Sequence, residues 1–461
     1  MAGIDSSTQS TKVLLVRASD GVVVDSAAAP HPNGTEVHPD AWWEALQQAG
    51  SGLLERASAI GVGGQQHGMV ALDAAGKVVR NALLWNDLRS AGQGGSVVEH
   101  LGGPQACADE IGSIPTASFT VTKLRWMFEN EPENAARTAA VLLPHDWLTW
   151  QLGGRQEMTT DHGDASGTGY YSPARRAWLP ELAAWALGRE QAPALPRLVE
   201  PAGVAGYARA IGNATGGTAV LSAGTGDNMA AALGLAIGPG DVVVSIGTSG
   251  TAFCIADTAC AEPTGSVSGF VDATGHYLPL VCTINASRIL SVTGGLLGVD
   301  HDEFARLALA GDPGAGGLTL LPYLDGERTP DRPTATGVFA GLTSGVTREN
   351  FARAAVEALL CSLADAVDAL GVSPTRVMMI GGGAKNPAVQ HLAPSVFGQP
   401  VQVLEPGEYV ALGAARQAAW ALSGAPTPPV WAAAPFTEFT GSRAPVVRQQ
   451  YDALRDATLT W

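Results

Sequence analysis

The sequence has little charge, and positive charge is especially scarce. Charged residues make up 15% of its 461 residues, and 27 Lys and Arg stand against 43 Asp and Glu, a formal net charge of −16. Nucleic acids and anionic membrane surfaces are bound by clustered Lys and Arg, so this balance argues against both as partners. A phosphorylated small molecule is still compatible with it, because backbone N–H groups can hold phosphate locally.

Cysteines are few and apolar runs are short. The five cysteines form an odd set without CxxC spacing, which predicts small core residues of a reduced protein: Cys107, Cys254, Cys260, Cys282 and Cys361. The first residues lack the basic and apolar segments of a signal peptide, and no run of 18 uncharged apolar residues occurs. We therefore expect a cytoplasmic protein with no membrane span. The length of 461 residues predicts two or three domains, and a hydrophobic fraction of 46% is enough for substantial cores.

The N-terminus has the pattern of a hairpin that could face phosphate. Residues 3–5 and 12–16 indicate two strands joined by a turn rich in Ser and Thr, and 22–24 indicates a third. Small hydroxyl residues in such a turn leave N–H groups accessible to phosphate oxygens. Asp5, at the end of the first strand, could hold Mg²⁺ through water. An ordinary surface hairpin would have the same pattern.

A second hairpin repeats this pattern in the other half of the chain. Residues 241–246 and 253–255 indicate strands, and Thr248, Ser249 and Thr251 supply the hydroxyls of the turn between them. Two such hairpins in corresponding places predict a duplicated fold. The first copy carries Asp5, whereas the second has Gly247. Only the first half would therefore supply an acid.

Two polar clusters follow short apolar strands and suit a polyhydroxylated ligand. The strand 59–63 leads into amides and an imidazole that lie between glycines, and a second apolar run leads into an aromatic, amide and acidic group. Glycines allow a ligand to approach the backbone, and sugar sites combine an aromatic face with polar groups. The candidate ligand-binding residues are Gln66, His67, Trp85, Asn86 and Asp87. A structural histidine, and a helix cap at Asn86 or Asp87, are the alternatives.

Residues 219–237 have the pattern of a strand, a tight glycine turn and a helix. Ala219 to Leu221 is apolar, Gly224 and Gly226 mark the turn, and an Ala-rich run follows Met229. Asp227 stands where the helix begins, and the helix dipole there favours an ionised carboxylate. Such a carboxylate could accept a proton from a substrate hydroxyl. The alternative is a simple N-cap, for which Asp is well suited.

Further along, a glycine triplet separates a buried strand from a helix. The strand 377–380, Gly381 to Gly383 and the helix 387–397 together resemble a turn that lets a nucleotide lie against the backbone. Long helices are predicted over 348–370 and 411–422, whereas the glycine-rich segment 93–103 is predicted to be a loop.

These pieces occur together, in one order, in a known family. The chain resembles the FGGY carbohydrate kinases, and within them the xylulokinases, in the following motifs: Gly3-Ile4-Asp5 with Thr8 and Lys12; Gly64 to Gly68; Leu84 to Asp87 with Arg89; Gly226 to Asn228; Ile246 to Gly250; Gly326 to Pro330; and Gly381 to Ala384. The resemblance implies an α/β fold of two actin-like (ribonuclease H-like) domains with an interdomain cleft. Residues 1–237 would form the sugar-binding domain and 238–461 the ATP-binding domain.

The resemblance also implies a reaction and roles for the residues. It predicts ATP-dependent phosphorylation of D-xylulose to D-xylulose 5-phosphate, with Asp227 as the base that takes the proton of the terminal hydroxyl. Asp5 would position Mg²⁺ and phosphate, and Gln66 and His67 would bind the sugar. The residues expected along the nucleotide are Thr8, Lys12, Gly247, Thr248, Gly382, Gly383 and Asn386.

Three alternatives stay open at this point. Gln66 stands where many xylulokinases have Met, so the substrate could be another ketose or a polyol. A non-catalytic actin-like sensor of sugar or nucleotide would share the fold, although the presence of both Asp5 and Asp227 favours an enzyme. A homodimer is one expected assembly, and the sequence does not decide it.

Overall fold

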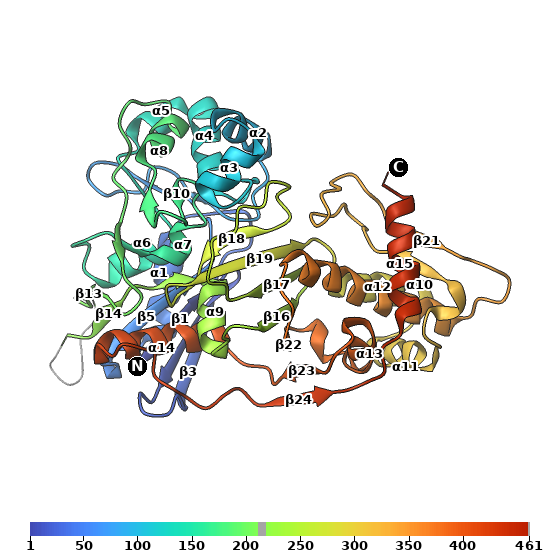
Figure 1. The fold of residues 1–461 in the computed structure, drawn as a ribbon. Helices are drawn as coiled ribbons and strands as arrows, with labels where there is room; N and C mark the ends of the chain where they lie inside the picture. The colour runs from blue at the N-terminus through green and yellow to red at the C-terminus, as the bar shows by residue number, and fades with distance from the viewer. Residues whose placement is uncertain (211–217, 460–461) are drawn as a thin grey trace. The chain divides into compact units, whose positions relative to one another are not determined.

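The computed structural model describes residues 1–210 and 218–459 (Figure 1). The chain forms two compact units. Unit 1 contains Met1–Ala236, Ala256–Leu278 and Glu408–Ala433, and unit 2 contains Ile237–Ile255, Pro279–Gly407 and Ala434–Trp461. The units therefore do not follow a single cut of the chain, because two later segments return to unit 1.

Unit 1 is built on a sheet whose central strand carries the first hairpin. The strand order is β13 (Val204–Tyr207), β14 (Val220–Ser222), β5 (Ala59–Gly64), β1 (Ala2–Ser6), β2 (Ser10–Val16) and β3 (Val23–Pro30), with β15 (Thr225–Gly226) beside β5. β1 is antiparallel to β2 and parallel to β5, and all of its residues are buried. The predicted N-terminal hairpin is confirmed.

Helices and short strands complete unit 1. The helices are α1 (Asp40–Gly50), α2 (Ala91–His100), α3 (Pro104–Ile111), α4 (Thr120–Asn130), α5 (Pro132–Arg137), α6 (Pro144–Leu152), α7 (His162–Ala165), α8 (Pro180–Ala186), α9 (Asp227–Leu235) and α14 (Tyr409–Ser423). The short strands are β4 (Glu36–Val37), β6 (Val70–Leu72), β7 (Ala82–Leu83), β8 (Ala140–Leu142), β9 (Thr159–Asp161), β10 (Tyr171–Ser172), β11 (Ala177–Trp178), β12 (Arg197–Val199) and β18 (Ser268–Val271). Trp42 and Trp147 are fully buried in the main core of this unit.

The prediction of a loop over 93–103 is wrong, because most of this segment lies in α2. Val97 is fully buried, and a Cβ on Gly94 would lie 2.6 Å from the carbonyl oxygen of Pro115. The glycine therefore allows a close approach between the helix and a neighbouring segment. Burial of one face stabilises this helix despite its poor helix formers.

Helix α14 packs against the sheet and α9 through glycines, although it lies far from them in sequence (Figure 1). A Cβ on Gly3 of β1 would lie 1.8 Å from the carbonyl oxygen of Ala411, and one on Gly61 of β5 would lie 2.1 Å from that of Ala414. Side chains at these two positions would push the helix away from the sheet. Gly3 and Gly61 are therefore required by packing.

Unit 2 repeats the strand order of unit 1. From one edge its strands are β24 (Phe436–Phe439), β23 (Val401–Leu404), β22 (Arg376–Ile380), β16 (Asp241–Ile246), β17 (Gly250–Cys254) and β19 (Tyr277–Thr283). β16 is antiparallel to β17 and parallel to β22, as β1 is to β2 and β5. The remaining pairs also correspond: β14 is parallel to β5 as β23 is to β22, and the pairs β13–β14, β2–β3, β23–β24 and β17–β19 are antiparallel. The predicted duplication is confirmed.

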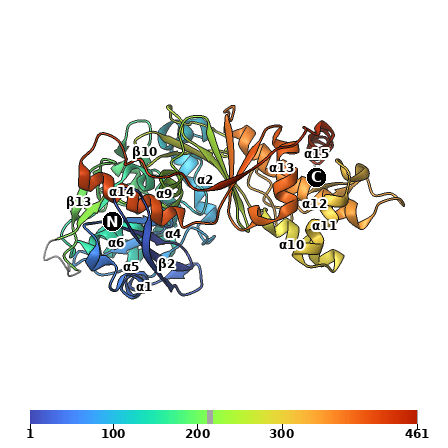
Figure 2. The same cartoon turned by 90° about the horizontal axis from the view of Figure 1, so that it is seen from below.

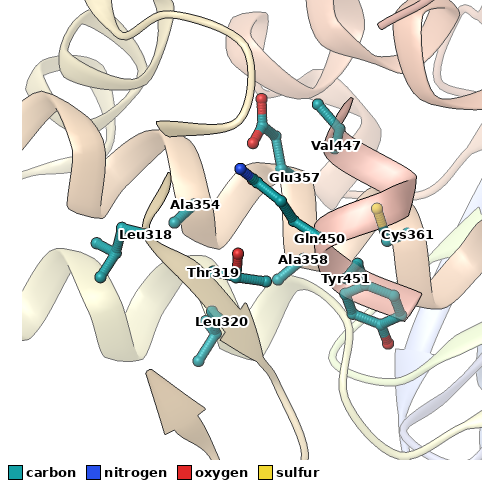
Figure 3. Close-up of a pocket in the computed structure, with 10 residues that line it drawn as sticks. All are labelled: Leu318, Thr319, Leu320, Ala354, Glu357, Ala358, Cys361, Val447, Gln450 and Tyr451. Atoms are coloured by element: carbon teal, nitrogen blue, oxygen red, sulfur yellow. The ribbon is translucent and has the colours of Figure 1, made fainter. Parts of the chain in front are cut away.

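The helices of unit 2 gather around α12 (Arg348–Ala369), which spans almost all of the predicted helix 348–370 (Figure 2). They are α10 (Ser287–Leu297), α11 (His301–Ala310), α13 (Pro387–Phe397) and α15 (Pro445–Ala457), and the remaining strands are β20 (Thr319–Leu321) and β21 (Val338–Ala340). A small pocket lies between α12, β20 and α15, where Glu357, Cys361 and Tyr451 contribute side chains (Figure 3). None of the predicted site residues lines it.

Neither the cysteines nor the helices indicate a crosslinked or membrane-inserted structure in the part described. All five cysteines lie in the described ranges and none is in a disulfide; Cys107, Cys254 and Cys361 are buried, as predicted for core residues, whereas Cys260 and Cys282 are only partly buried. In the described ranges no helix combines the length and apolar character that crossing a membrane requires.

Candidate active site

The candidate site of unit 1 forms where three strands meet at one end of the sheet. β5 pairs with β1 on one side and with β15 on the other. Gly64 is the register partner of both Ser6 and Gly226, so Asp5 and Asp227 flank the same end of β5. The sheet therefore brings together the two acids that the sequence placed more than 200 residues apart.

Asp5 is a buried carboxylate with a single hydroxyl donor among its described partners. Its side chain is 4% exposed and accepts a hydrogen bond from Ser7 Oγ at 2.6 Å. Burial raises its pKa to about 6, against the opposing effects of the Ser7 hydrogen bond and of Lys12. A nearby cation would favour the ionised form of this group.

Asp227 is the first residue of α9, and Gly226 occupies the N-cap position without a side-chain hydrogen bond. The capping alternative is therefore wrong. Oδ1 of Asp227 accepts hydrogen bonds from the backbone N–H of Asn228 at 2.8 Å and from Asn228 Nδ2 at 3.0 Å. Burial, and then the charge of Asp5, raise its pKa to about 7. The helix N-terminus was expected to lower this pKa. Desolvation and the like charge of Asp5 oppose ionisation and have the larger effect.

Asn228 connects the proposed base to Gln66; the sequence analysis named it within a family motif but gave it no role in the site. Its Nδ2 donates to Gln66 Oε1 at 2.9 Å as well as to Asp227. Gln66 is 4% exposed, and its Nε2 is buried without a hydrogen-bond partner. A buried amide donor of this kind needs an acceptor, which a sugar hydroxyl would provide. The feature of the sequence that could have indicated a role for Asn228 is its position directly after Asp227.

His67 adopts a left-handed backbone conformation with φ of 67°. Its Nδ1 lies 2.6 Å from the carbonyl oxygen of Gly167, and its backbone carbonyl accepts a hydrogen bond from Thr120 Oγ1 at 3.0 Å. The ring lies near the rings of Phe119 and Phe270, with centroids 4.8 and 5.8 Å away. These contacts hold a backbone conformation that costs free energy in a residue with a side chain, a combination common at functional sites.

The second polar cluster reaches the first hairpin through Trp85. Its Nε1 donates to Thr8 Oγ1 at 2.9 Å, and the side chain is 42% exposed.

Lys12 forms an ion pair with Glu408, 2.6 Å between Nζ and Oε2. The Glu408 partner is remote in sequence, and no local pattern indicated it.

Asn86 and Asp87 differ in whether the protein supplies hydrogen bonds to their side-chain oxygens. Oδ1 of Asn86 is buried without a hydrogen-bond partner. The carboxylate of Asp87 accepts hydrogen bonds from Thr35 and Arg89. Although burial alone would raise its pKa, the bonds from Arg89 and Thr35 hold the pKa of Asp87 below its usual value. Asn86 is the member of this pair with an acceptor left for a ligand.

The donor set at the end of β1 and β5 fits Mg²⁺. This ion prefers carboxylate oxygens and retains several waters, so one or two carboxylates are sufficient. Asp5 provides a buried carboxylate, and the nearby charge of Asp227 makes the site more favourable for a cation. The residues present therefore fit the metal that the sequence predicts.

The predicted nucleotide residues of unit 2 also meet at strand ends. Ser245 near the end of β16 is paired with Ile380 at the end of β22, so the second hairpin and the glycine triplet lie side by side. A Cβ on Gly381, whose φ is 93°, would lie 2.7 Å from the carbonyl oxygen of Ile246. Gly247 and Thr248 are exposed at the tip of the hairpin. The duplicated topology thus builds a second strand-end site, in which Gly247 stands where the first has Asp5.

The three remaining residues of this set have different surroundings. A Cβ on Gly383 would lie 2.4 Å from Cγ2 of Ile246, whereas around Gly382 there is no heavy atom within 4 Å of such a Cβ. Asn386 is the N-cap of α13, and its Oδ1 accepts hydrogen bonds from the backbone of Ala388 and Val389. Gly383 is therefore fixed by packing, and Gly382 borders open space.

Comparison with known families matches both halves of the chain. Residues 1–234 match the N-terminal domain of the FGGY family of carbohydrate kinases, and residues 242–422 match the C-terminal domain of the same family. Together the two matches cover most of the chain in the expected order.

Individual relatives agree with the family matches. A xylulose kinase of Streptomyces coelicolor is 47% identical over 439 residues, which cover 92% of this chain and 88% of the relative. A xylulose kinase of Escherichia coli is 34% identical over 437 residues, with 90% and 89% covered. The crystal structure of xylulose kinase from Bifidobacterium adolescentis has a TM-score of 0.92 at 45% identity and covers 99% of both chains.

Proposed function

We propose that this chain, which belongs to the FGGY family of carbohydrate kinases, transfers the γ-phosphoryl group of ATP to D-xylulose. The product would be D-xylulose 5-phosphate. The relatives that cover most of this chain bear the name xylulose kinase, which supports this choice of sugar. The observation that carries the chemistry is the pair of acids, Asp5 and Asp227, on either side of the end of β5.

In the proposed reaction Asp227 is the general base. The terminal hydroxyl oxygen of the sugar attacks the γ-phosphorus, the bond from that phosphorus to the bridging oxygen breaks, and ADP leaves. The hydroxyl proton goes to the Asp227 carboxylate, whose raised pKa of about 7 makes it a better base than an ordinary Asp near neutral pH. Asn228 holds this carboxylate toward Gln66.

The sugar would be bound by the polar groups that the protein leaves unsatisfied. Nε2 of Gln66 and Oδ1 of Asn86 are buried without partners and can pair with hydroxyls. His67, held in place by Phe119 and Gly167, would contact the sugar beside Gln66. Trp85 would provide an aromatic face. Asp87 would act through Arg89, because its carboxylate is already occupied by that side chain.

Phosphoryl transfer depends mainly on positioning and on neutralising charge. Asp5 would hold Mg²⁺, which when bound neutralises phosphate charge. Thr8 and Lys12 of the first hairpin would lie near the phosphates, where Lys12 would exchange its contact with Glu408 for a phosphate oxygen. Gly247, Thr248, Gly382, Gly383 and Asn386 would border the nucleotide.

Three broader assignments complete the proposal. Residues 1–237 would carry most of the sugar site and residues 238–461 most of the ATP site, with 256–278 and 408–433 belonging to unit 1. The enzyme would act in the cytoplasm, in keeping with five cysteines of which none is in a disulfide. A homodimer is the proposed assembly, and its test is the mass of the protein in solution.

The test is an ADP-release assay over a panel of D-xylulose, D-ribulose, D-fructose and glycerol, with the wild type and Asp227→Ala. We expect the highest kcat/KM with D-xylulose and a loss of kcat of about 10² to 10⁴-fold in the variant. Asp20→Ala, an exposed acid in the β2–β3 turn that pairs with Arg17, is the matched control.

Near-normal turnover by Asp227→Ala would contradict the role of this residue. A preference for another member of the panel would change the substrate while keeping the kinase. ATP binding without any sugar-dependent turnover would favour the sensor.

A further inference from the structure

We propose that Asp161, together with the buried His145–Asp164 pair, positions the carboxylate of Asp227 by fixing the turn that precedes it. Asp161 and His145 contact the turn, and Asp164 contacts His145. All three lie in unit 1, and none of them belongs to the predicted sugar or nucleotide residues. The inference rests on the proposed role of Asp227 as the base. It adds positioning residues that act through the turn.

Asp161 holds the turn through Thr225, two residues before the proposed base. Thr225 Oγ1 donates to Asp161 Oδ2 at 2.6 Å, and both side chains are buried. The same carboxylate accepts hydrogen bonds from the backbone N–H groups of Gly163 and Asp164, at 2.9 and 2.8 Å. Asp161 therefore links the turn to the first residues of α7, and a charged acceptor makes each of these bonds stronger than a neutral one.

His145 of α6 lies directly against the backbone of the turn. A Cβ on Gly224, whose φ is 73°, would lie 2.4 Å from Cδ2 and 3.0 Å from Nε2 of His145. A Cβ on Gly64, at the end of β5, would lie 2.9 Å from Cβ of His145. The two glycines thus allow His145 to pack closely, with its ring against Gly224 of the turn and its backbone and Cβ against Gly64 of β5.

The imidazole of His145 lies between two buried carboxylates. Its Nδ1 is 2.6 Å from Asp164 Oδ2 and its Nε2 is 3.2 Å from Asp146 Oδ1, and all three side chains are at most 1% exposed. Although burial favours the neutral ring, Asp146 and Asp164 outweigh it and raise the pKa of His145 to about 10. A buried cation paired in this way is costly to displace, so the ring is a fixed support.

A third element, α14, also bonds to the turn, although it lies almost 200 residues later in the chain. Gln417 of α14 is fully buried; its Nε2 donates to the carbonyl oxygen of Gly224 at 3.1 Å, and its Oε1 accepts from Ser222 Oγ at 3.1 Å. The turn is thus connected to α6, α7 and α14. Gln66 packs against Gly226 and bonds to Asn228, whereas the Thr225 hydroxyl bonds to Asp161 and not to Gln66. Loss of the Thr225 bond should therefore change the position of Asp227, and with it the chemical step, more than sugar binding.

The experiment compares Thr225→Val, which keeps the shape but removes the donor, with Thr225→Ser, which keeps the hydroxyl. For Thr225→Val we expect kcat to fall about 10- to 100-fold, because small misplacements of a reacting group have effects of this size. KM for D-xylulose should stay within about threefold, and Thr225→Ser should restore most of kcat. Thr149→Val is the control, since this buried hydroxyl has no hydrogen-bond partner.

The Asp227→Ala background separates this inference from the role of the base. If Thr225 acts through Asp227, adding Thr225→Val to Asp227→Ala should lower the residual rate by less than about twofold. Wild-type kcat in Thr225→Val, or a KM that rises as kcat falls, would overturn the positioning role while leaving the base intact. Full activity of Asp227→Ala would remove the base itself and this inference with it.

His145→Gln provides a second measurement if Thr225→Val folds poorly. We expect a lower kcat at unchanged KM, as for Thr225→Val, and elemental analysis of the wild-type protein should find no stoichiometric transition metal. One equivalent of such a metal, lost in His145→Gln, would show that His145, Asp146 and Asp164 bind a cation. That result would overturn the ion-pair support proposed here.

Discussion

The two hairpins have the same strand pairing but end in different chemistry. β1 and β16 are each antiparallel to the next strand and parallel to a strand that arrives after a long connection. Unit 1 places Asp5 and Asp227 at this strand end, and unit 2 places Gly247 and the triplet Gly381 to Gly383 there. The fold brings strand ends together in both units, and the side chains decide the use of each.

The difference follows from what each strand end is proposed to face. Carboxylates can bind a cation and accept a proton, but they would repel the phosphates of a nucleotide. Glycines let a backbone approach a ligand and carry no charge. A duplicated fold can therefore divide the reaction, with the acid chemistry in unit 1 and close backbone contact in unit 2.

Among the changes that compare the two hairpins directly, the largest effect is expected at Asp5, the acid that the second hairpin lacks. Asp5→Asn retains an acceptor for Ser7 but loses the charge that would hold Mg²⁺. We expect kcat to fall about 10²- to 10³-fold and the Mg²⁺ concentration for half-maximal rate to rise. Ser7→Ala is the control, with an expected loss of only a few-fold. An unchanged Mg²⁺ requirement in Asp5→Asn would contradict the assignment.

The pH dependence of the reaction should reflect the proposed base. Protonated Asp227 cannot accept a proton, and its pKa is about 7 in the protein without ligands. We expect kcat/KM for D-xylulose to fall about tenfold per pH unit on the acid side, beginning at or below pH 7 because bound Mg²⁺ favours ionisation. The measurement is a rate profile from pH 5 to 9. A flat profile across the acid range would argue against a carboxylate base.

The glycine triplet can be tested with two neighbouring substitutions. Gly382 has helical dihedral angles and no heavy atom near the place of a Cβ, so Gly382→Val should leave the melting temperature unchanged. If a nucleotide lies there, KM for ATP should rise about tenfold. Gly383→Ala should instead destabilise the protein by about 1 to 3 kcal/mol, because its Cβ would meet Ile246. An unchanged KM for ATP in Gly382→Val would contradict the nucleotide assignment.

The smallest effect concerns stability. The pKa of Asp227 is raised above its unfolded value of about 3.9, so the native state binds more protons between about pH 4 and 7. The stability contribution of this carboxyl group is present at low pH and is lost as the pH rises through about 7. Asp227→Asn should therefore raise the melting temperature by about 2 to 4 °C at pH 8, and by less at pH 5, in EDTA. An equal change at both pH values would contradict the raised pKa.

Local patterns were sufficient to predict much of the fold and the elements that carry Asp5 and Asp227. Strand, turn and helix signals around Asp5, Asp227 and Gly382 depend on neighbouring residues, and the structure has those elements in place. The repeated hairpin was visible because both copies keep Ser and Thr in the turn. Alternation and turn residues are local properties, so one sequence reports them well.

The contacts that support the site could not be predicted from local sequence patterns. Glu408 pairs with Lys12 across almost 400 residues, and Gln417 reaches Gly224 from α14. Such pairs depend on how the chain folds back on itself. The raised pKa of Asp227 has a similar origin, because it requires burial and the proximity of Asp5. Local signals indicated only the helix N-terminus, which would have lowered the pKa.

The most direct test of the account is single-turnover phosphoryl transfer from labelled ATP to D-xylulose by wild type and Asp227→Asn, with both ligands at saturating concentration. Calorimetry on the same samples would show whether the variant still binds sugar and nucleotide. The account predicts retained binding and a transfer step at least about 10²-fold slower. Transfer by Asp227→Asn at the wild-type rate would contradict it.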